Sequence, residues 1–338
     1  LCMTTVTHAK ETVSTTRVNT VAKTGWQYTN DNWYYYDANG NIQTGWTSYG
    51  GHKYYLHPNG TMAKGWVFTD GHYQYLNNFG IQQFGWQMIN GNWYHFDENG
   101  DMETGWIIYN NRNYYMRPSG EMATGWVFTN GHYQYLNTVG IQQTGWQMIN
   151  GKWYLLDTDG NMETGWIQYN GRNYYMRPSG EMATGWVYTN DHYQYLDAFG
   201  IQKYGWQNVY NTWYYLGDDG NMQTGWLNLS QNYYYCNSSG AMLTGWQFIN
   251  GNWYYMAPSG VMLSGWQYIN GHWYYLGDSN DGSMKSGWQI IHGTTYYFKA
   301  NGMMAENGWL LENGTWYHFR AGGAQDYTQT TAPTLTYD

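Results

Sequence analysis

The sequence predicts an all-β fold, a β-solenoid of about fifteen stacked β-hairpins with three hairpins in each turn. The dipeptide Gly-Trp occurs fifteen times, and its first thirteen occurrences are spaced by 20 residues. Aromatic residues make up 21% of the chain and charged residues 11%, against about 25% charged residues in average proteins. Residues 65–124 align with residues 125–184 at 48 identities in 60 positions. Together these patterns are typical of a repeat protein built from short aromatic strands.

Each repeat reads as one hairpin followed by a connector. In the repeat that starts at Trp86, residues 87–89 and 92–96 are the predicted strands, and Asn90-Gly91 is a favoured two-residue turn between them. Residues 97–100 form a second turn, which leads into a connector that carries Met102. An isolated hairpin is marginally stable in water, so each hairpin must stack on its neighbours, and stacked repeats form a solenoid.

The 60-residue period indicates that the duplicated unit is three hairpins. One solenoid turn for every three hairpins explains this period, and shared ancestry of a 60-residue block is a rival explanation. The predicted organisation is a linker over residues 1–24, the repeat solenoid over residues 25–320, and a C-terminal tail over residues 321–338.

Composition argues against several classes of partner. The net charge is −9 and the sequence has no basic stripe, which argues against nucleic acid as a partner. No run of 18 apolar residues is present, so we expect no membrane insertion. Cys2 and Cys236 lie far apart in the sequence, and Cys236 stands where other repeats carry Leu, Met or Phe. We therefore expect Cys236 to be a buried free thiol rather than half of a disulfide.

The sequence predicts no enzymatic activity for this chain, no cofactor and no metal site. Acidic residues such as Asp97 and Asp157 fall in turns, where Asp is expected for backbone reasons. A glycosidase needs two carboxylates in a cleft, and no segment outside the repeats is large enough to build one. His72, His132 and His192 recur at 60-residue spacing and do not converge as metal ligands would.

The aromatic residues of each hairpin are the candidate binding groups. Counting the tryptophan of Gly-Trp as position zero, the residue at position seven shares its face of the hairpin, because side chains alternate along a strand. Position seven is Trp in some repeats but Lys53 or Asn113 in others, which favours contact with a ligand over a role in the core. Trp pairs of this kind occur at Trp26/Trp33, Trp86/Trp93, Trp146/Trp153, Trp206/Trp213, Trp246/Trp253, Trp266/Trp273 and Trp309/Trp316.

Two indoles near a Tyr and a Met suit a quaternary ammonium, which is attracted to the faces of aromatic rings. They also suit the apolar face of a sugar. The tryptophans at position zero are expected to share this role with packing between hairpins.

Segments such as GWQYINGHWYYLGDS resemble the choline-binding, or cell-wall-binding, repeat family, and the resemblance covers about residues 24–320. Related repeats are similar to the glucan-binding regions of glucansucrases and to the repeats of clostridial toxins. The resemblance implies a β-solenoid of hairpins that attaches a secreted, cell-wall-associated protein to choline-bearing teichoic acid or to a glucan or other glycan polymer.

In the choline-binding branch of this family, two Trp of one hairpin, a Tyr of the next and often a Met form one site. Carried over to this chain, the resemblance implies four such sites, in each of which two adjacent tyrosines are open candidates. They are Trp86 and Trp93 with Tyr114 or Tyr115 and Met102; Trp146 and Trp153 with Tyr174 or Tyr175 and Met162; Trp206 and Trp213 with Tyr234 or Tyr235 and Met222; and Trp246 and Trp253 with Tyr274 or Tyr275 and Met262.

Two hairpins in every three depart from this pattern. Asn113 and Asn173 replace the second Trp in the hairpins that start at Trp106 and Trp166. Gln82, Gln142 and Gln202 stand where Met is expected, and this weakens the choline interpretation for the hairpins that start at Trp66, Trp126 and Trp186. Asn and Gln hydrogen-bond to sugar hydroxyls, which raises the glycan alternative.

Three functions therefore stay open at this point. The first is a non-catalytic module that binds the wall or a glycan through aromatic cages. The second is the glucan-binding region or targeting part of a larger secreted enzyme, such as a glucansucrase or a wall lysin. The third is a structural adhesin without a small ligand.

Overall fold

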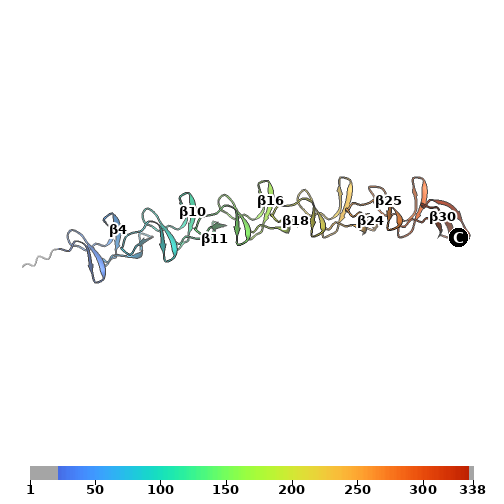
Figure 1. Ribbon diagram of the computed structural model, residues 1–338. Coiled ribbons are helices and arrows are strands. Elements are labelled where there is room, and N and C mark those ends of the chain that lie inside the picture. The colour runs from blue at the N-terminus through green and yellow to red at the C-terminus, as the bar shows by residue number, and fades with distance from the viewer. Residues whose placement is uncertain (1–21, 335–338) are drawn as a thin grey trace, which may run out of the picture. The chain divides into compact units, whose positions relative to one another are not determined.

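The computed structural model describes residues 22–334, and in this range the chain forms strands and turns with no helix (Figure 1). Contacts divide the described residues into two units, residues 22–150 with 154–163, and residues 151–153 with 164–334. The all-β prediction and the fifteen hairpins are confirmed within residues 22–334. Each hairpin pairs two consecutive strands of five residues, and the last one adds a third strand.

The fourteen two-stranded hairpins are β1 (Gly25–Thr29) with β2 (Asn32–Tyr36), β3 (Gly45–Tyr49) with β4 (His52–Leu56), β5 (Gly65–Thr69) with β6 (His72–Leu76), β7 (Gly85–Ile89) with β8 (Asn92–Phe96), β9 (Gly105–Tyr109) with β10 (Arg112–Met116), β11 (Gly125–Thr129) with β12 (His132–Leu136), β13 (Gly145–Ile149) with β14 (Lys152–Leu156), β15 (Gly165–Tyr169) with β16 (Arg172–Met176), β17 (Gly185–Thr189) with β18 (His192–Leu196), β19 (Gly205–Val209) with β20 (Thr212–Leu216), β21 (Gly225–Leu229) with β22 (Asn232–Cys236), β23 (Gly245–Ile249) with β24 (Asn252–Met256), β25 (Gly265–Ile269) with β26 (His272–Leu276) and β27 (Gly287–Ile291) with β28 (Thr294–Phe298). The fifteenth hairpin is the three-stranded sheet β29 (Gly308–Glu312), β30 (Thr315–Phe319) and β31 (Gln325–Gln329).

The turn chemistry sets the register of each hairpin. Asn90 and Gly91 both have positive φ, 50° and 85°, which is the backbone that a two-residue turn between twisted strands requires. This turn pairs Ile89 with Asn92 and Trp86 with His95, as the sequence predicts.

The two faces of a hairpin differ in burial. In the hairpin of β7 and β8, Ile89, Tyr94 and Phe96 are 5%, 9% and 1% exposed, whereas Met88 and Trp93 on the opposite face are 51% and 41% exposed. Full burial of one such apolar side chain stabilises the fold by about 1.5–3 kcal/mol. The core therefore lies on the face of Ile89, and the face of Trp93 is left open to solvent.

The connector closes onto its own hairpin and onto the hairpin before it. The Asp97 carboxylate accepts hydrogen bonds from the backbone N–H groups of Asn99 and Asp101, at 2.8 and 2.9 Å, and this fixes the turn. The Met102 N–H then donates to the Tyr73 carbonyl of the preceding hairpin at 2.7 Å.

The equivalent hydrogen bond occurs thirteen times in residues 22–334, from Met62 with Trp33 to Met304 with Trp273. It binds successive hairpins together without a continuous sheet.

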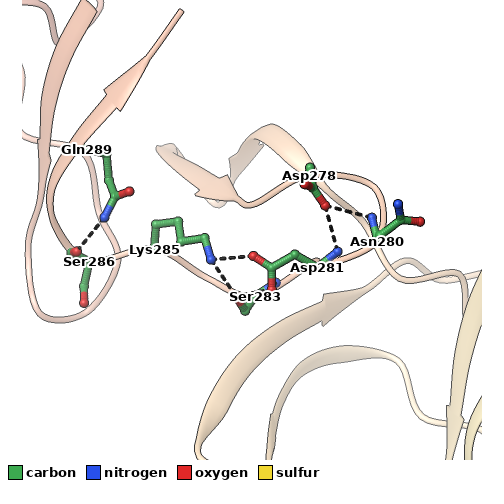
Figure 2. A network of polar contacts seen from close by, with 7 residues as sticks. All are labelled: Asp278, Asn280, Asp281, Ser283, Lys285, Ser286 and Gln289. Atoms are coloured by element: carbon green, nitrogen blue, oxygen red, sulfur yellow. Dashed lines mark hydrogen bonds and ion pairs between the residues drawn. The ribbon is translucent and has the colours of Figure 1, made fainter.

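A two-residue insertion between β26 and β27 is absorbed by a local polar network (Figure 2). The Asp278 carboxylate accepts from the N–H groups of Asn280 and Asp281, both at 3.0 Å. Lys285 pairs with the Asp281 carboxylate and donates to the Ser283 hydroxyl at 2.8 Å. Because of this network, the connector follows the same course as in the other repeats despite the insertion. Met284 therefore takes the position in its repeat that Met102 takes in the repeat of Trp86.

The ends of the repeat region differ from the expected boundaries. Strand β31 lies within the segment expected to be a C-terminal tail and pairs with β30. Most of the expected N-terminal linker, residues 1–21, lies outside the described residues, as do residues 335–338.

Cys236 is a buried free thiol, as predicted, and burial raises its pKa to about 11. Cys2 lies outside the described residues. In residues 22–334, no helix is long and apolar enough to cross a membrane.

The two glycines that flank a connector, Gly80 and Gly85, give a direct test of this packing. Gly80 has φ of +77°, and a Cβ there would lie 2.5 Å from the Met62 sulfur, whereas Gly85, at φ +63°, has no atom within 4 Å of its ideal Cβ. We expect Gly85→Ala to cost about 1–2 kcal/mol from backbone strain alone. Gly80→Ala should cost about 1–3 kcal/mol more, because the methionine must also move. Thermal unfolding followed by circular dichroism measures both, and equal midpoints would contradict the packing described here.

Candidate functional site

Each candidate site takes its tryptophans, tyrosine and methionine from two consecutive hairpins. The first hairpin supplies its residues at positions zero and seven. The next hairpin supplies the residue at its own position eight. The connector of that next hairpin adds one more residue, whose backbone hydrogen bond holds it beside position seven of the first hairpin. The pocket at Trp246 illustrates this: its volume is about 320 Å³, and Trp253, Tyr274 and Met284 line it. The Met284 N–H donates to the Trp253 carbonyl at 2.7 Å.

The rings of such a site meet at steep angles. Trp86 and Trp93 have centroids 6.4 Å apart at 86°, and Trp86 lies 5.0 Å from Tyr114 at 61°. The Met122 N–H donates to the Trp93 carbonyl at 2.7 Å, which brings this connector to the same corner. We use the name aromatic site for a set of four side chains: the Trp at position zero, an aromatic residue at position seven, the Tyr of the next hairpin and the Met of its connector.

The structure distinguishes between the two adjacent tyrosines that sequence left open. Tyr114, Tyr234 and Tyr274 lie 4.9–5.0 Å from the position-zero tryptophan of the preceding hairpin. The second tyrosine of each pair packs on the tryptophan of its own hairpin instead, at 5.1–5.2 Å; these residues are Tyr115 on Trp106, Tyr175 on Trp166, Tyr235 on Trp226 and Tyr275 on Trp266.

Backbone hydrogen bonds hold the methionines at other hairpins than those of the tryptophans with which the sequence grouped them. Met102, Met162, Met222 and Met262 hydrogen-bond to Tyr73, Tyr133, Tyr193 and Tyr233, in each case one hairpin earlier in the chain. The methionines held at Trp93, Trp213 and Trp253 are instead Met122, Met242 and Met284. Their contribution was missed because a connector follows its own hairpin in sequence but closes the site of the hairpin before it.

Two further Trp pairs form the same arrangement. Trp26 and Trp33 line a pocket of about 300 Å³ with Tyr54 and Met62. Trp266 lies 6.3 Å from Trp273 and 4.8 Å from Tyr296, and the Met304 N–H donates to the Trp273 carbonyl at 2.9 Å.

The pair Trp146 and Trp153 falls across the two units: Trp146 belongs to the first, and Trp153 and Tyr174 belong to the second. Within the second unit, the Met182 N–H donates to the Trp153 carbonyl at 2.8 Å. A complete site at this pair stays a prediction.

The hairpins with Tyr at position seven also build aromatic sites, which sequence reasoning set aside. Trp66 lies 6.4 Å from Tyr73 and 4.9 Å from Tyr94, and the connector that reaches Tyr73 carries Met102. Burial, and second the nearby Glu121 carboxylate, raise the pKa of Tyr94, so its phenol stays protonated at neutral pH. Trp186, Tyr193, Tyr214 and Met222 repeat this arrangement.

The two departures from the family pattern, a polar residue at position seven and Gln in place of the connector Met, fall in the same sites. The Gln82 N–H donates to the Lys53 carbonyl at 3.0 Å, and those of Gln142 and Gln202 donate to the carbonyls of Asn113 and Asn173 at 2.9 Å. The glutamines therefore belong to the sites of Trp46, Trp106 and Trp166, and not to the hairpins in which they stand in sequence. We call these three sets the polar sites.

The aromatic sites have the chemistry to hold an organic cation. Aromatic ring faces attract a quaternary ammonium, and the polarizable sulfur of methionine fills the remaining wall. In residues 22–334, no cluster of three His, Cys, Asp or Glu side chains has an arrangement that would hold a metal ion.

Comparison with known proteins gave matches to repeat families and solved structures. Residues 84–125, 123–164, 163–200, 204–244, 243–286 and 285–329 match the choline-binding repeat, and residues 24–42 and 44–62 match the cell wall binding repeat. The search of curated proteins gave no match.

Among solved structures, CbpJ from Streptococcus pneumoniae TIGR4 is 29% identical over 89% of this chain and 100% of that one, with a TM-score of 0.42. Choline binding protein F from Streptococcus pneumoniae is 27% identical over 84% of this chain and 98% of that one, with a TM-score of 0.48. The modular autolysin LytC from Streptococcus pneumoniae, solved with a synthetic peptidoglycan ligand, is 24% identical over 78% of this chain and 52% of that one, with a TM-score of 0.32. Since the matched choline-binding repeats run through most of residues 84–329, the chain belongs to the choline-binding repeat family.

Proposed function

We propose that this chain is a non-catalytic binding module that attaches a secreted protein to choline-bearing polymers of the bacterial cell wall. The observation that carries the proposal is the aromatic site itself, in which two consecutive hairpins supply aromatic rings and a methionine to a pocket of about 300–320 Å³ that the turn of the following hairpin also lines. A quaternary ammonium has no N–H to donate, so a site made of ring faces recognises it better than a site made of hydrogen-bond acceptors.

The exposure of position seven supports a role in binding. Trp33, Trp93, Trp213 and Trp253 are each 40–44% exposed, although a tryptophan gains most stability when it is buried. Exposed indoles repeated at equivalent positions favour a ligand that covers them.

Many weak sites on one chain fit a polymeric ligand. An exposed cation–π contact contributes only about 0.5–1 kcal/mol, so we expect single sites to bind choline weakly. A polymer that carries repeated choline groups can engage several sites at once, and linked sites gain about 10²–10⁴ in apparent affinity.

We also propose that the hairpins wind as a solenoid with three hairpins in each turn. The proposal is supported within the first unit by the recurrence of site chemistry, because Trp46 and Trp106 carry polar sites one 60-residue period apart and two aromatic sites lie between them. Sites of one kind would then lie on one side of that unit.

A second candidate function is the targeting part of a larger wall-active enzyme or a glucan-binding region. The polar sites favour a sugar as ligand, because Gln and Asn amide groups stand where an aromatic site has ring faces.

The two tryptophans of one site are expected to differ in how much each contributes to stability. Trp86 contacts the rings of Trp93, His95, Tyr109 and Tyr114, whereas Trp93 is 41% exposed. We expect Trp86→Ala to lower stability by about 3–5 kcal/mol and Trp93→Ala to lower it by about 1 kcal/mol or less. Thermal unfolding measures the difference, and equal unfolding midpoints would contradict this division of roles.

The adjacent tyrosines give a matched pair for choline binding. Equilibrium dialysis with radiolabelled choline counts the choline bound at saturation. We expect Tyr114→Leu to lose about one bound choline per chain, because Tyr114 closes the site at Trp86. Tyr115→Leu should keep the wild-type count, because Tyr115 packs on Trp106, which belongs to a polar site. An equal loss in both variants, or no saturable choline binding by the wild type, would refute the proposed assignment.

A further inference from the structure

The aromatic pockets have a further wall that comes from a third hairpin. Phe79, in the turn after β6, lines the pocket at Trp26, and Asn301, in the turn after β28, lines the pocket at Trp246. Each is the thirteenth residue after the Gly-Trp tryptophan of its own repeat, and we call this place position thirteen. It belongs to the second hairpin after the one that supplies the tryptophans of the pocket.

A close approach of the backbone explains why this turn reaches the pocket. Gly80 follows Phe79, and a Cβ at Gly80 would lie 2.5 Å from the Met62 sulfur. The turn therefore rests on the same methionine whose N–H donates to the Trp33 carbonyl. Three consecutive hairpins meet at this methionine, and position thirteen lies at the edge of the pocket.

The site at Trp93 has the same contact. The Met122 N–H donates to the Trp93 carbonyl, and a Cβ at Gly140 would clash with the Met122 sulfur. Val139 precedes Gly140, as Phe79 precedes the glycine of the first site. By this equivalence, Val139 is the residue of the third hairpin at this site.

The chemistry of position thirteen varies along the chain. Only three of the fifteen repeats have an apolar residue there, Phe79, Val139 and Phe199, and these are 77%, 59% and 76% exposed. Their repeats are each the second after a Trp pair, whereas the pairs at Trp206 and Trp246 are followed at this position by Ser259 and Asn301. The Trp pairs therefore fall into two groups, one with an apolar residue at position thirteen and one with a polar residue.

The exposed ring of Phe79 stands on a fixed turn. The Asn77 side-chain oxygen accepts hydrogen bonds from the N–H groups of Phe79 and Ile81, at 2.9 and 3.0 Å. A large apolar side chain in this position gains little packing in the free protein, so its presence favours a role in covering a ligand.

We infer that position thirteen sets the affinity of an aromatic site, and that Phe79 and Val139 cover a quaternary ammonium held by the tryptophans. The inference rests on the proposed function and adds a residue from a third hairpin to it. The ring face of Phe79 attracts the cation, Val139 contacts only its methyl groups, and Ser or Asn offers neither interaction. Choline sites of graded affinity then follow one another along the chain.

The chain supplies matched variants for a test. Phe79→Ser introduces the residue that Ser119 places in another repeat, and Val139→Phe introduces an aromatic ring where the site has an aliphatic side chain. Both positions are exposed, so neither change should disturb folding. Phe68→Ser is the control, because Phe68 lies in the same hairpin as Phe79 and is 60% exposed, but lies outside the lining of the pocket at Trp26.

The variants are compared within one site rather than between sites, because Lys64 also lines the pocket at Trp26 and its charge opposes a cation. The full chain, labelled with carbon-13 at the methionine methyl groups, reports each site separately by NMR. Met62 reports on the first site and Met122 on the second, and Met→Leu variants assign their resonances. Titration with choline gives a dissociation constant for each site, and 3,3-dimethylbutan-1-ol serves as an uncharged probe of similar shape.

We expect Phe79→Ser to weaken choline binding at Met62 about two- to fivefold, which corresponds to one exposed cation–π contact. Binding of the uncharged probe should weaken by less, because it has no charge for the ring to attract. Val139→Phe should strengthen choline binding at Met122 by a similar factor, and Phe68→Ser should leave both dissociation constants unchanged.

Choline affinity that Phe79→Ser leaves unchanged at Met62, or that Val139→Phe leaves unchanged at Met122, would overturn the inference and leave the proposed function in place. No choline-dependent shift at Met62, Met122 or Met284 would refute the proposed function, and the inference with it.

Discussion

The backbone hydrogen bond from each connector to position seven of the preceding hairpin is the constraint on which the other features depend. A hairpin alone buries little surface, and its two strands have no further strand to pair with. The bond from Met122 to Trp93 and its twelve equivalents in residues 22–334 join the first fourteen hairpins in succession, and each brings one connector side chain to the residue at position seven. Stability and binding therefore use the same contact, since the residues that join two hairpins also line the pocket between them.

Because side chains alternate along each strand, one face of a hairpin forms the core and the other face is exposed. Ile89 and Phe96 are buried on one face, while Trp93 stays on the open face. The tryptophan at position zero lies between these roles, because Trp86 packs on its own hairpin and on Tyr114 of the next. Variation at position seven changes the chemistry of a site without touching the core, which is how one scaffold carries both aromatic and polar sites.

Sequence predicted the local structure well because it follows from neighbouring residues. Asn90-Gly91 fixed the turn, the turn fixed the register, and the register placed Trp86 and Trp93 on one face. The membership of each site could not be predicted this way, because it depends on contacts between residues about 30 positions apart. Met102 was grouped with Trp93 but is held at Tyr73, and Gln82 was assigned to the hairpin of Trp66 but lies at Trp46.

A crystal structure of the protein with bound choline tests the central claim, that the binding site is shared between consecutive hairpins, most directly. The account predicts trimethylammonium groups in the corner formed by Trp86, Trp93, Tyr114 and Met122, and in the equivalent pocket of Trp246, Trp253, Tyr274 and Met284. Choline bound within one hairpin and its own connector, or at none of the aromatic sites, would contradict it.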